Sequence, residues 1–258
     1  MCEGIPKSIT IEHIRRETPT IRTFVFSEEF SYRPGQFVMV WIPGVDDIPM
    51  ALSSPRSISV QKIGDATKAL FSLKVGDKIG IRGPYGNWFP NEGETLAICG
   101  GIGAAPLVHL AKIDCINTFL LGARTEDELP FVDILDECTN LLIATNDGTL
   151  GYNGFVTELL DEVNLIDLNS FDNICVCGPE RMMKIVLDRL EKKGMAQKGY
   201  FSLNRYIKCG LGICGSCCID PKGLRVCRDG PIFNGEVLLT SEFGLYTRDA
   251  SGIRQKIE

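Results

Sequence analysis

The sequence has little of what marks several common classes of protein. It holds only two histidines, His13 and His109, which stand far apart in the chain, and we assign neither to a metal or to catalysis. The 27 Lys and Arg against 33 Asp and Glu give a net charge of −6, which argues against nucleic acid as a partner. No run of roughly 18 apolar residues is present to cross a membrane, and the first residues contain no apolar signal region. We therefore expect neither a nucleic-acid nor a membrane partner.

A disulfide framework is also not indicated, although cysteine is abundant. The 11 cysteines are odd in number and scattered through the chain, a usage typical of a reducing compartment. Hydrophobic residues make up 44% of the 258, enough to build two domains of ordinary size and a small addition. We expect a cytoplasmic protein with free thiols.

Four of the cysteines share a spacing that points to metal. The spacing is C-x4-C-x2-C followed by a fourth cysteine, the ligand pattern of a plant-type two-iron two-sulfur (2Fe-2S) cluster. The four expected ligands are Cys209, Cys214, Cys217 and Cys227. Glycines between them let a short loop turn its sulfurs inward and bring backbone N–H groups near the cluster. The alternatives are a structural zinc site, which usually takes two pairs of cysteines, and a loop of ordinary thiols.

Two further features of this loop yield expectations. Cys218 is a fifth thiol, and we expect it not to be a ligand because Cys217 keeps the two-residue gap. Leu211 and Ile213 stand between glycines and cannot point inward past the ligating sulfurs. At least one of them should therefore be exposed in the isolated chain.

The first third of the chain reads as short strands divided by turns. Residues 21–26 and 35–42 are rich in β-branched and aromatic residues. Turn signals such as Pro34-Gly35 and Gly83-Pro84 follow at close intervals, and the helical signal is weak. This pattern predicts an antiparallel β-barrel.

From about Thr95 strands alternate with helices, which predicts a parallel sheet covered on both faces. Short apolar strands are expected over residues 95–99, 117–121, 141–145 and 173–177. Helices are expected over residues 104–112 and 153–162, and a longer one begins at Pro179 and closes at Gly194. The acidic residues 126–128 read as a solvated helix start.

Two glycine turns follow strands of this sheet. Gly101 and Gly103 lie between a strand and a helix, and Cys177-Gly178 ends a later strand. Open α/β sheets bind ligands at the carboxyl ends of their strands, where a helix N-terminus offers N–H groups to a pyrophosphate. We expect the turns to line a nicotinamide site, in which a side chain at Gly103 would block the dinucleotide. Alternatively, the loop is a plain tight turn and Cys177 is ordinary packing.

The chain resembles the ferredoxin–NADP reductase superfamily and, within it, the electron-transfer subunit of type B dihydroorotate dehydrogenase. The resemblance covers nearly the whole chain in the same order. It rests on the segments 33–37, 64–67, 76–78, 83–86, 99–103, 146–148, 154–157, 177–179, 202–203 and 209–231. It implies an N-terminal flavin-binding β-barrel (1–92), a nucleotide-binding α/β domain (93–200) and a 2Fe-2S domain with tail (201–258).

The resemblance further implies an electron relay in pyrimidine biosynthesis. A partner subunit with FMN would oxidise dihydroorotate, and electrons would pass through the 2Fe-2S cluster and FAD of this chain to NAD. The flavin joins the one-electron cluster to the two-electron nicotinamide. Two catalytic and two electron-transfer subunits would form a heterotetramer. The chain itself is expected to hold no residue that takes a proton from the pyrimidine.

Three segments of the barrel are expected to hold FAD by the same resemblance. The expected residues are Met50, Ala51, Leu52, Ser53, Ser59, Val60, Gln61, Ala66 and Thr67. The family's motif has an arginine for the pyrophosphate where this chain has Met50, and Arg56 is a candidate substitute. Met50 as ordinary barrel core is the alternative.

Two rival functions remain open from the sequence. One is a flavin and iron–sulfur subunit of another reductase, such as a ferredoxin-dependent NADP oxidoreductase or a sulfur-reducing hydrogenase. The other is a binding module stapled by zinc, without redox chemistry.

Overall fold

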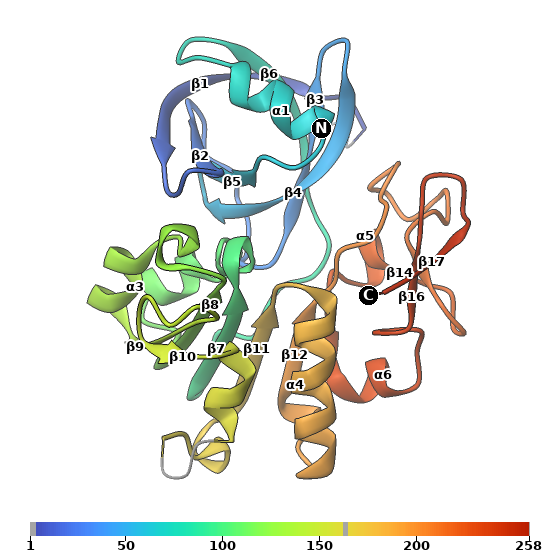
Figure 1. Cartoon of the computed structure of the whole chain (residues 1–258). Helices are drawn as coiled ribbons and strands as arrows, with labels where there is room; N and C mark the ends of the chain where they lie inside the picture. Colours follow the sequence, from blue (N-terminus) through green and yellow to red (C-terminus); the bar gives the residue numbers. More distant parts are fainter. Residues whose placement is uncertain (1–3, 162–164, 258) are drawn as a thin grey trace.

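The computed structural model describes residues 4–161 and 165–257 and has the expected architecture. Residues up to about 90 close into a barrel, drawn in blue to turquoise at the top of Figure 1, with strand order β1-β2-β5-β4-β3-β6. Every pairing within it is antiparallel. The strands are β1 (Lys7–Arg16), β2 (Ile21–Phe26), β3 (Phe37–Ile42), β4 (Asp46–Ser54), β5 (Ser57–Gln61) and β6 (Lys78–Tyr85).

Alternation along these strands builds the barrel core. Phe24, Val38 and Ile58 are fully buried inside it, and the neighbours of each along its own strand point outward. A helix that the sequence did not predict, α1 (Asp65–Ser72), buries Leu70 against this core. Thr67 caps it, since its hydroxyl accepts hydrogen bonds from the N–H groups of Ile63 and Gly64.

The second part is a seven-stranded sheet of order β10-β9-β8-β7-β11-β12-β15. All its pairings are parallel except that of β15 with β12. The four predicted strands are confirmed. The strands are β7 (Thr95–Gly100), β8 (Thr118–Ala123), β9 (Asn140–Thr145), β10 (Tyr152–Asn153), β11 (Asn173–Cys177), β12 (Gly199–Ser202) and β15 (Ile232–Asn234).

The helices of this part confirm some expectations and correct others. The amphipathic helix after Pro179 is confirmed as α4 (Glu180–Lys192), which buries Met183, Val186, Leu187 and Leu190. The helix expected over 104–112 is shorter, α2 (Val108–Lys112), because the chain first forms the 3-10 helix η1 (Gly101–Ala104). The helix start expected at residues 126–128 precedes α3 (Val132–Cys138), whose bounds were not predicted.

The prediction of a helix over 153–162 was wrong for residues 153–161, the part of this segment that the structure describes. This segment ends β10 and then forms the 3-10 helix η3 (Val156–Leu160), and Glu162 lies outside the described residues. Residues 126–128 form the exposed 3-10 helix η2 (Glu126–Glu128). Two more 3-10 helices are η4 (Leu168–Ser170) and η5 (Ala196–Lys198).

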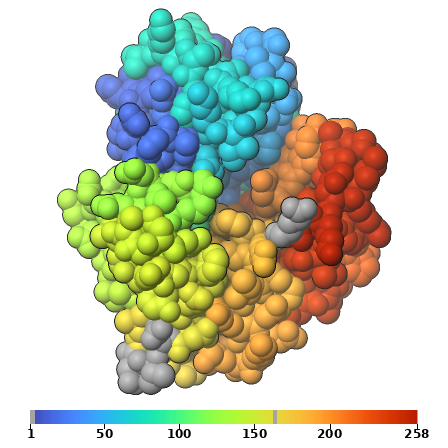
Figure 2. Space-filling model, viewed as in Figure 1, coloured from blue at the N-terminus to red at the C-terminus, as the bar shows by residue number. Residues whose placement is uncertain are grey.

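The last part stands beside both others, as the orange and red lobe of Figure 2. Its elements are β13 (Cys218–Ile219), β14 (Leu224–Arg225), α5 (Val226–Asp229), α6 (Gly235–Leu239), β16 (Tyr246–Arg248) and β17 (Arg254–Lys256). It also supplies β15 to the seven-stranded sheet, so this last part and the sheet are joined by backbone hydrogen bonds. None of the helices within the described ranges has the length and apolar character needed to cross a membrane.

Candidate cofactor sites

The cysteine loop is shaped by left-handed glycines and directs N–H groups at sulfur. Gly210, Gly212 and Gly215 have φ values of 71°, 72° and 74°, which other residues rarely adopt. The Leu211 N–H lies 3.4 Å from Cys209 Sγ, and the Gly212 N–H lies 3.2 Å from Cys227 Sγ. Donors so placed stabilise negative charge on sulfur, as a cluster with thiolate ligands requires.

The four expected ligands come together as two pairs. The Cys209 side chain contacts Cys214, and the Cys217 side chain contacts Cys227. Each iron of a two-iron cluster binds two thiolates, so paired thiols fit that group. Among residues 4–161 and 165–257, no three His, Cys, Asp or Glu side chains are placed to hold a single metal ion.

The electrostatics of the loop favour thiolates at two of these positions. Burial opposes ionisation of Cys209, but backbone hydrogen bonds from Cys214, Ile213 and Leu211 outweigh it and lower its pKa to about 6. The hydrogen bond with Cys227 is the main cause that lowers the pKa of Cys217 to about 6, against the effect of burial. The same contact raises the pKa of Cys227. One thiol can therefore serve as donor to a neighbouring thiolate before metal arrives.

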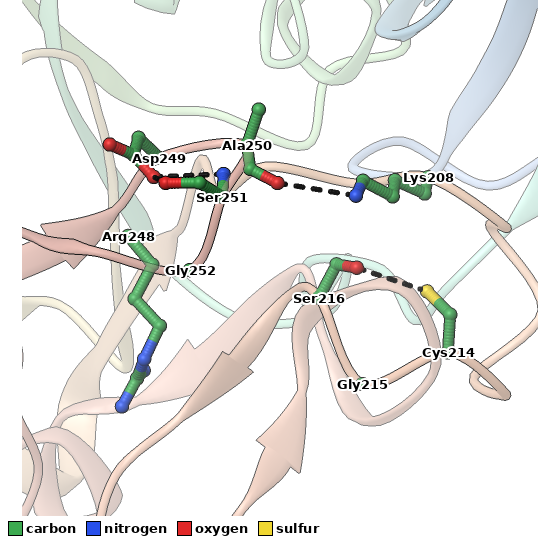
Figure 3. Close-up of a pocket in the computed structure, with 9 residues that line it drawn as sticks. All are labelled: Lys208, Cys214, Gly215, Ser216, Arg248, Asp249, Ala250, Ser251 and Gly252. Atoms are coloured by element: carbon green, nitrogen blue, oxygen red, sulfur yellow. Dashed lines mark hydrogen bonds between the residues drawn. The ribbon is translucent and has the colours of Figure 1, made fainter.

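Cys218 lies in a different environment. It belongs to β13, opposite Arg225 of β14, and its pKa is raised by burial and then by the charge of Cys217. Cys214 is exposed and faces a cavity of about 330 Å³ (Figure 3). Across this cavity lies the turn between β16 and β17, where the Lys208 ammonium donates to the Ala250 carbonyl at 3.2 Å.

The loop also presents apolar surface. Ile213 is 80% exposed, whereas Leu211 is half-buried. The expectation that at least one of the two is exposed is confirmed by Ile213. Ile213 therefore leaves an apolar side chain in solvent beside the cysteines.

The outer wall of the barrel carries a row of hydroxyls. The Ser53 and Ser59 Oγ atoms lie 3.0 Å apart, and Ser59 Oγ lies 2.8 Å from the Thr23 hydroxyl. Ser57 joins them at 3.0 Å from Ser53. All four are buried although they alternate with core residues, because β4 and β5 contact α2 and η1 of the neighbouring sheet. Hydroxyls at such a junction can hydrogen-bond the ribityl chain and phosphates of a flavin.

A tyrosine at the same junction was missed from the sequence. The hydroxyl of Tyr32 is enclosed and has no hydrogen-bond partner among the described residues. Its ring lies 5.7 Å from that of His109 on α2. An orphaned buried hydroxyl between barrel and sheet fits a polar group bound there. One tyrosine before an Arg-Pro-Gly turn carries no such signal in a single sequence.

The other expected FAD residues fall into two groups. Leu52 and Val60 are fully buried in the barrel core, so they could reach FAD only through their backbone, whereas Met50 and Ala66 are half-buried and pack against the core. Ala51 and Gln61 are half-buried on β4 and β5, and the Thr67 hydroxyl caps α1.

Arg56, the candidate substitute for the missing arginine, is held by contacts within the barrel. Its guanidinium forms an ion pair with Glu12 and donates to the Phe26 carbonyl at 2.9 and 3.1 Å. These contacts engage Nε and Nη2, and the role of Arg56 as a substitute for the missing arginine stays a prediction.

The two glycine turns lie next to each other. β7 and β11 are parallel neighbours with Cys99 opposite Cys177, so the turns that follow them meet. A Cβ on Gly103 would stand 2.3 Å from the Cys177 carbonyl oxygen, whereas one on Gly101 would meet nothing within 4 Å. Gly103 is thus required by close packing of the turns, and Gly101, at φ 51°, faces open space. Cys177 is half-buried, and burial, opposed by a hydrogen bond with Ser202, raises its pKa to about 12.

Comparison with known proteins agrees with this geometry. The family described as the iron-sulfur cluster binding domain of dihydroorotate dehydrogenase B matches residues 204–239. A protein of Methanocella arvoryzae named "Probable dihydroorotate dehydrogenase B (NAD(+)), electron transfer subunit" is 54% identical and covers 98% of this chain and 99% of its own. A protein of Methanocaldococcus jannaschii with the same name is 46% identical and covers 96% of this chain and 97% of its own.

Solved structures share the fold. A chain of an NADH-dependent reduced ferredoxin-NADP oxidoreductase, studied for flavin-based electron bifurcation, superposes with a TM-score of 0.79 at 30% identity, covering 91% of this chain and 90% of that one. The FAD/NAD binding domain of a nitric oxide dioxygenase from Vibrio cholerae gives 0.66 at 20% identity, over 76% of this chain and 98% of that one. From the identities over nearly full length, the chain belongs to the family of electron transfer subunits of dihydroorotate dehydrogenase B.

Proposed function

We propose that this chain carries electrons between a catalytic subunit that oxidises dihydroorotate and NAD, through a 2Fe-2S cluster and FAD. The observation that carries the proposal is the cysteine loop: paired thiols with N–H groups aimed at sulfur, beside an exposed Ile213. When bound, FAD exchanges a hydride with nicotinamide and single electrons with the cluster. The residues of the chain would hold these groups in order.

We assign the cluster to Cys209, Cys214, Cys217 and Cys227. The loop N–H groups offset the negative charge that the cluster gains on reduction. Cys214, the exposed ligand, marks the edge nearest solvent and hence nearest a partner.

We assign FAD to the junction between barrel and sheet. Ser53 and Ser59 would bond its polar chain from the barrel wall, and Tyr32 would use its free hydroxyl there. Met50, Ala51, Leu52, Val60 and Gln61 would line the site mainly through backbone. Ala66 and Thr67 would present the start of α1 to the pyrophosphate.

The nicotinamide would enter at the adjoining turns. Gly101 leaves room for the dinucleotide, Gly103 lets the turns meet, and Cys177-Gly178 closes the far side. With its pKa raised, Cys177 remains a neutral thiol near pH 7 and adds no charge beside the flavin.

We also make proposals about the subunit assembly, the domain boundaries and the cellular location of the chain. We propose a heterotetramer of two catalytic and two electron-transfer chains, with the cluster loop at the contact. We also propose the division into parts at 1–92, 93–200 and 201–258. A cytoplasmic setting fits the ten cysteines of the described ranges, all of which are free.

Reconstitution tests the proposal. The chain is co-expressed with a candidate catalytic subunit, and the purified complex is assayed anaerobically for dihydroorotate-dependent reduction of NAD and of NADP. NADH formation by the complex, but by neither subunit alone, is the expected result. Reduction of NADP that depends on added reduced ferredoxin, with no response to dihydroorotate, would favour the rival reductase instead. A colourless chain with stoichiometric zinc would leave only the binding module.

A further inference from the structure

One arginine of the barrel reaches the cysteine loop. Arg82 stands on β6, and its side chain is only 9% exposed. Its Nη1 donates to the Cys209 carbonyl at 2.5 Å, and Nη2 donates to the Lys208 carbonyl at 3.3 Å. The first of these contacts joins residues 127 positions apart and touches the first expected ligand of the cluster.

The guanidinium is itself held in place from the barrel. Asp47 on β4 accepts from Nε at 3.2 Å and from Nη2 at 2.6 Å, and the Tyr85 ring lies 5.9 Å from the guanidinium carbon. The other carboxylate oxygen of Asp47 is enclosed without a hydrogen-bond partner among the described residues. A fork held on one side by a carboxylate can direct its remaining donors with little freedom.

The loop lies directly on this part of the barrel. A Cβ on Gly210 would stand 3.1 Å from Met39 Cγ, 3.3 Å from Tyr85 Cε2 and 3.4 Å from Arg82 Nη1. Met39 is fully buried under the loop, although it is on the outer side of β3. The ligand loop therefore takes its position from the same barrel that we assign to FAD.

We propose that Arg82, oriented by Asp47, is a positioning residue that fixes the Cys209 side of the cluster site on the flavin barrel and tunes the reduction potential of the cluster. The inference rests on the proposed function for the presence of the cluster. Reduction adds one negative charge, so a nearby cation raises the potential and a nearby carboxylate lowers it. The two members of the pair should therefore act with opposite sign.

The test compares three variants in the purified holoprotein by EPR-monitored redox titration. Arg82→Gln removes the cation and should lower the midpoint potential, whereas Asp47→Asn removes the counter-charge and should raise it. Arg82→Lys keeps the charge but loses the fork, so its potential should stay nearer the wild-type value. A role in folding alone would not give shifts of opposite sign.

A second readout needs no bound cluster. Hydrogen exchange of the apoprotein amides at residues 209–212 should be faster in Arg82→Gln and Arg82→Lys than in wild type. Arg189→Gln is the matched control, because Arg189 also pairs with a carboxylate, that of Asp161, and donates to a backbone carbonyl, that of Thr157, but does so from α4. It should change neither the potential nor the exchange of the loop.

The outcomes separate the two claims. Wild-type protein without iron would remove the proposed function before any variant is compared. If iron is present, an unchanged or lowered potential in Asp47→Asn overturns the inference about Arg82, and so does unchanged loop exchange in both Arg82 variants. If Arg82→Gln fails to hold the cluster, the potential of Asp47→Asn and the exchange data still test the inference about Arg82.

Discussion

Among single residues, cluster ligation depends on which thiols face one another. Cys217 and Cys218 are neighbours in sequence, yet only Cys217 turns toward Cys227. Cys218 belongs to a two-stranded hairpin, where alternation sends its side chain to the other face. The x2 gap predicted the same choice from the sequence.

Replacement of these thiols should therefore have unequal effects. Cys227→Ser places a harder oxygen on iron and should deplete the cluster or shift its EPR signal. Cys218→Ser should leave iron content and the visible spectrum as in wild type. An intact spectrum in the first variant with a lost one in the second would contradict the ligand assignment.

Substitutions at the two glycines of the first turn, Gly101 and Gly103, should also have different effects. Gly103→Ala puts a methyl group within 2.3 Å of a backbone oxygen, so we expect a lower Tm and less soluble protein. Gly101→Asn has room, and asparagine tolerates a positive φ, so the fold and the flavin content should be kept. Its side chain points where the dinucleotide would lie, and stopped-flow reduction of the flavin by NADH should slow. Unchanged NADH kinetics in Gly101→Asn would show that this loop is only a turn.

At the scale of elements, a buried charge network joins the sheet to the cluster part. Arg205, with 2% of its side chain exposed, forms two hydrogen bonds with Glu180 at the start of α4, at 2.5 and 2.9 Å. Its Nε lies 3.5 Å from Glu242, which also accepts from Arg248 and from the Asp220 N–H. α4 begins directly after Cys177-Gly178-Pro179, so the network ties the proposed nicotinamide turn to the cluster part.

Loss of the central arginine should be costly. Arg205→Met leaves the enclosed Glu180 carboxylate without its cation and leaves Glu242 with Arg248 as its cation. Breaking a buried pair in this way costs about 3–5 kcal/mol. The urea midpoint of the purified protein should fall markedly. Arg124→Met is the control, because Arg124 also makes a forked pair with Glu128 but is 76% exposed; its midpoint should not move. Equal midpoints for the two variants would contradict the importance of the network.

The elements that sequence predicted are those with a strong periodic signal. The strands β7 and β11 are buried on both faces and read as continuous apolar runs, and α4 repeats its buried residues at helical spacing. The helices α1 and α3 are short, and α3 follows Phe131 at φ 64° with no capping side chain. Such segments take helical form from tertiary packing, which local sequence does not report.

For the whole molecule, the parts of the site that could be predicted are those whose residues lie close together in sequence. The cluster ligands lie within one loop and its neighbour, so their spacing alone predicted them. The seat of that loop on the barrel, through Arg82 and Met39, joins distant segments and needed the structure. The hydroxyl row likewise unites β2, β4 and β5 through sheet register.

Docking of the catalytic subunit is expected where the loop is exposed. Ile213→Glu puts a charge into the proposed contact and should weaken association about tenfold or more, a loss of about 1.4 kcal/mol or above. Iron and flavin contents should be unchanged. Val75→Glu is the control, since Val75 is 60% exposed on the turn after α1. Normal association and electron transfer in Ile213→Glu would show that the partner binds elsewhere.

The most direct test of the relay uses the complex with its cluster removed. Cys227→Ser is assembled with the catalytic subunit, and two rates are measured anaerobically: reduction of the FAD by NADH, and formation of NADH from dihydroorotate and NAD. Our account predicts that the first rate stays near wild type while the second is lost with the cluster. Dihydroorotate-dependent NADH formation at the wild-type rate, in a complex shown to lack iron in this chain, would contradict it.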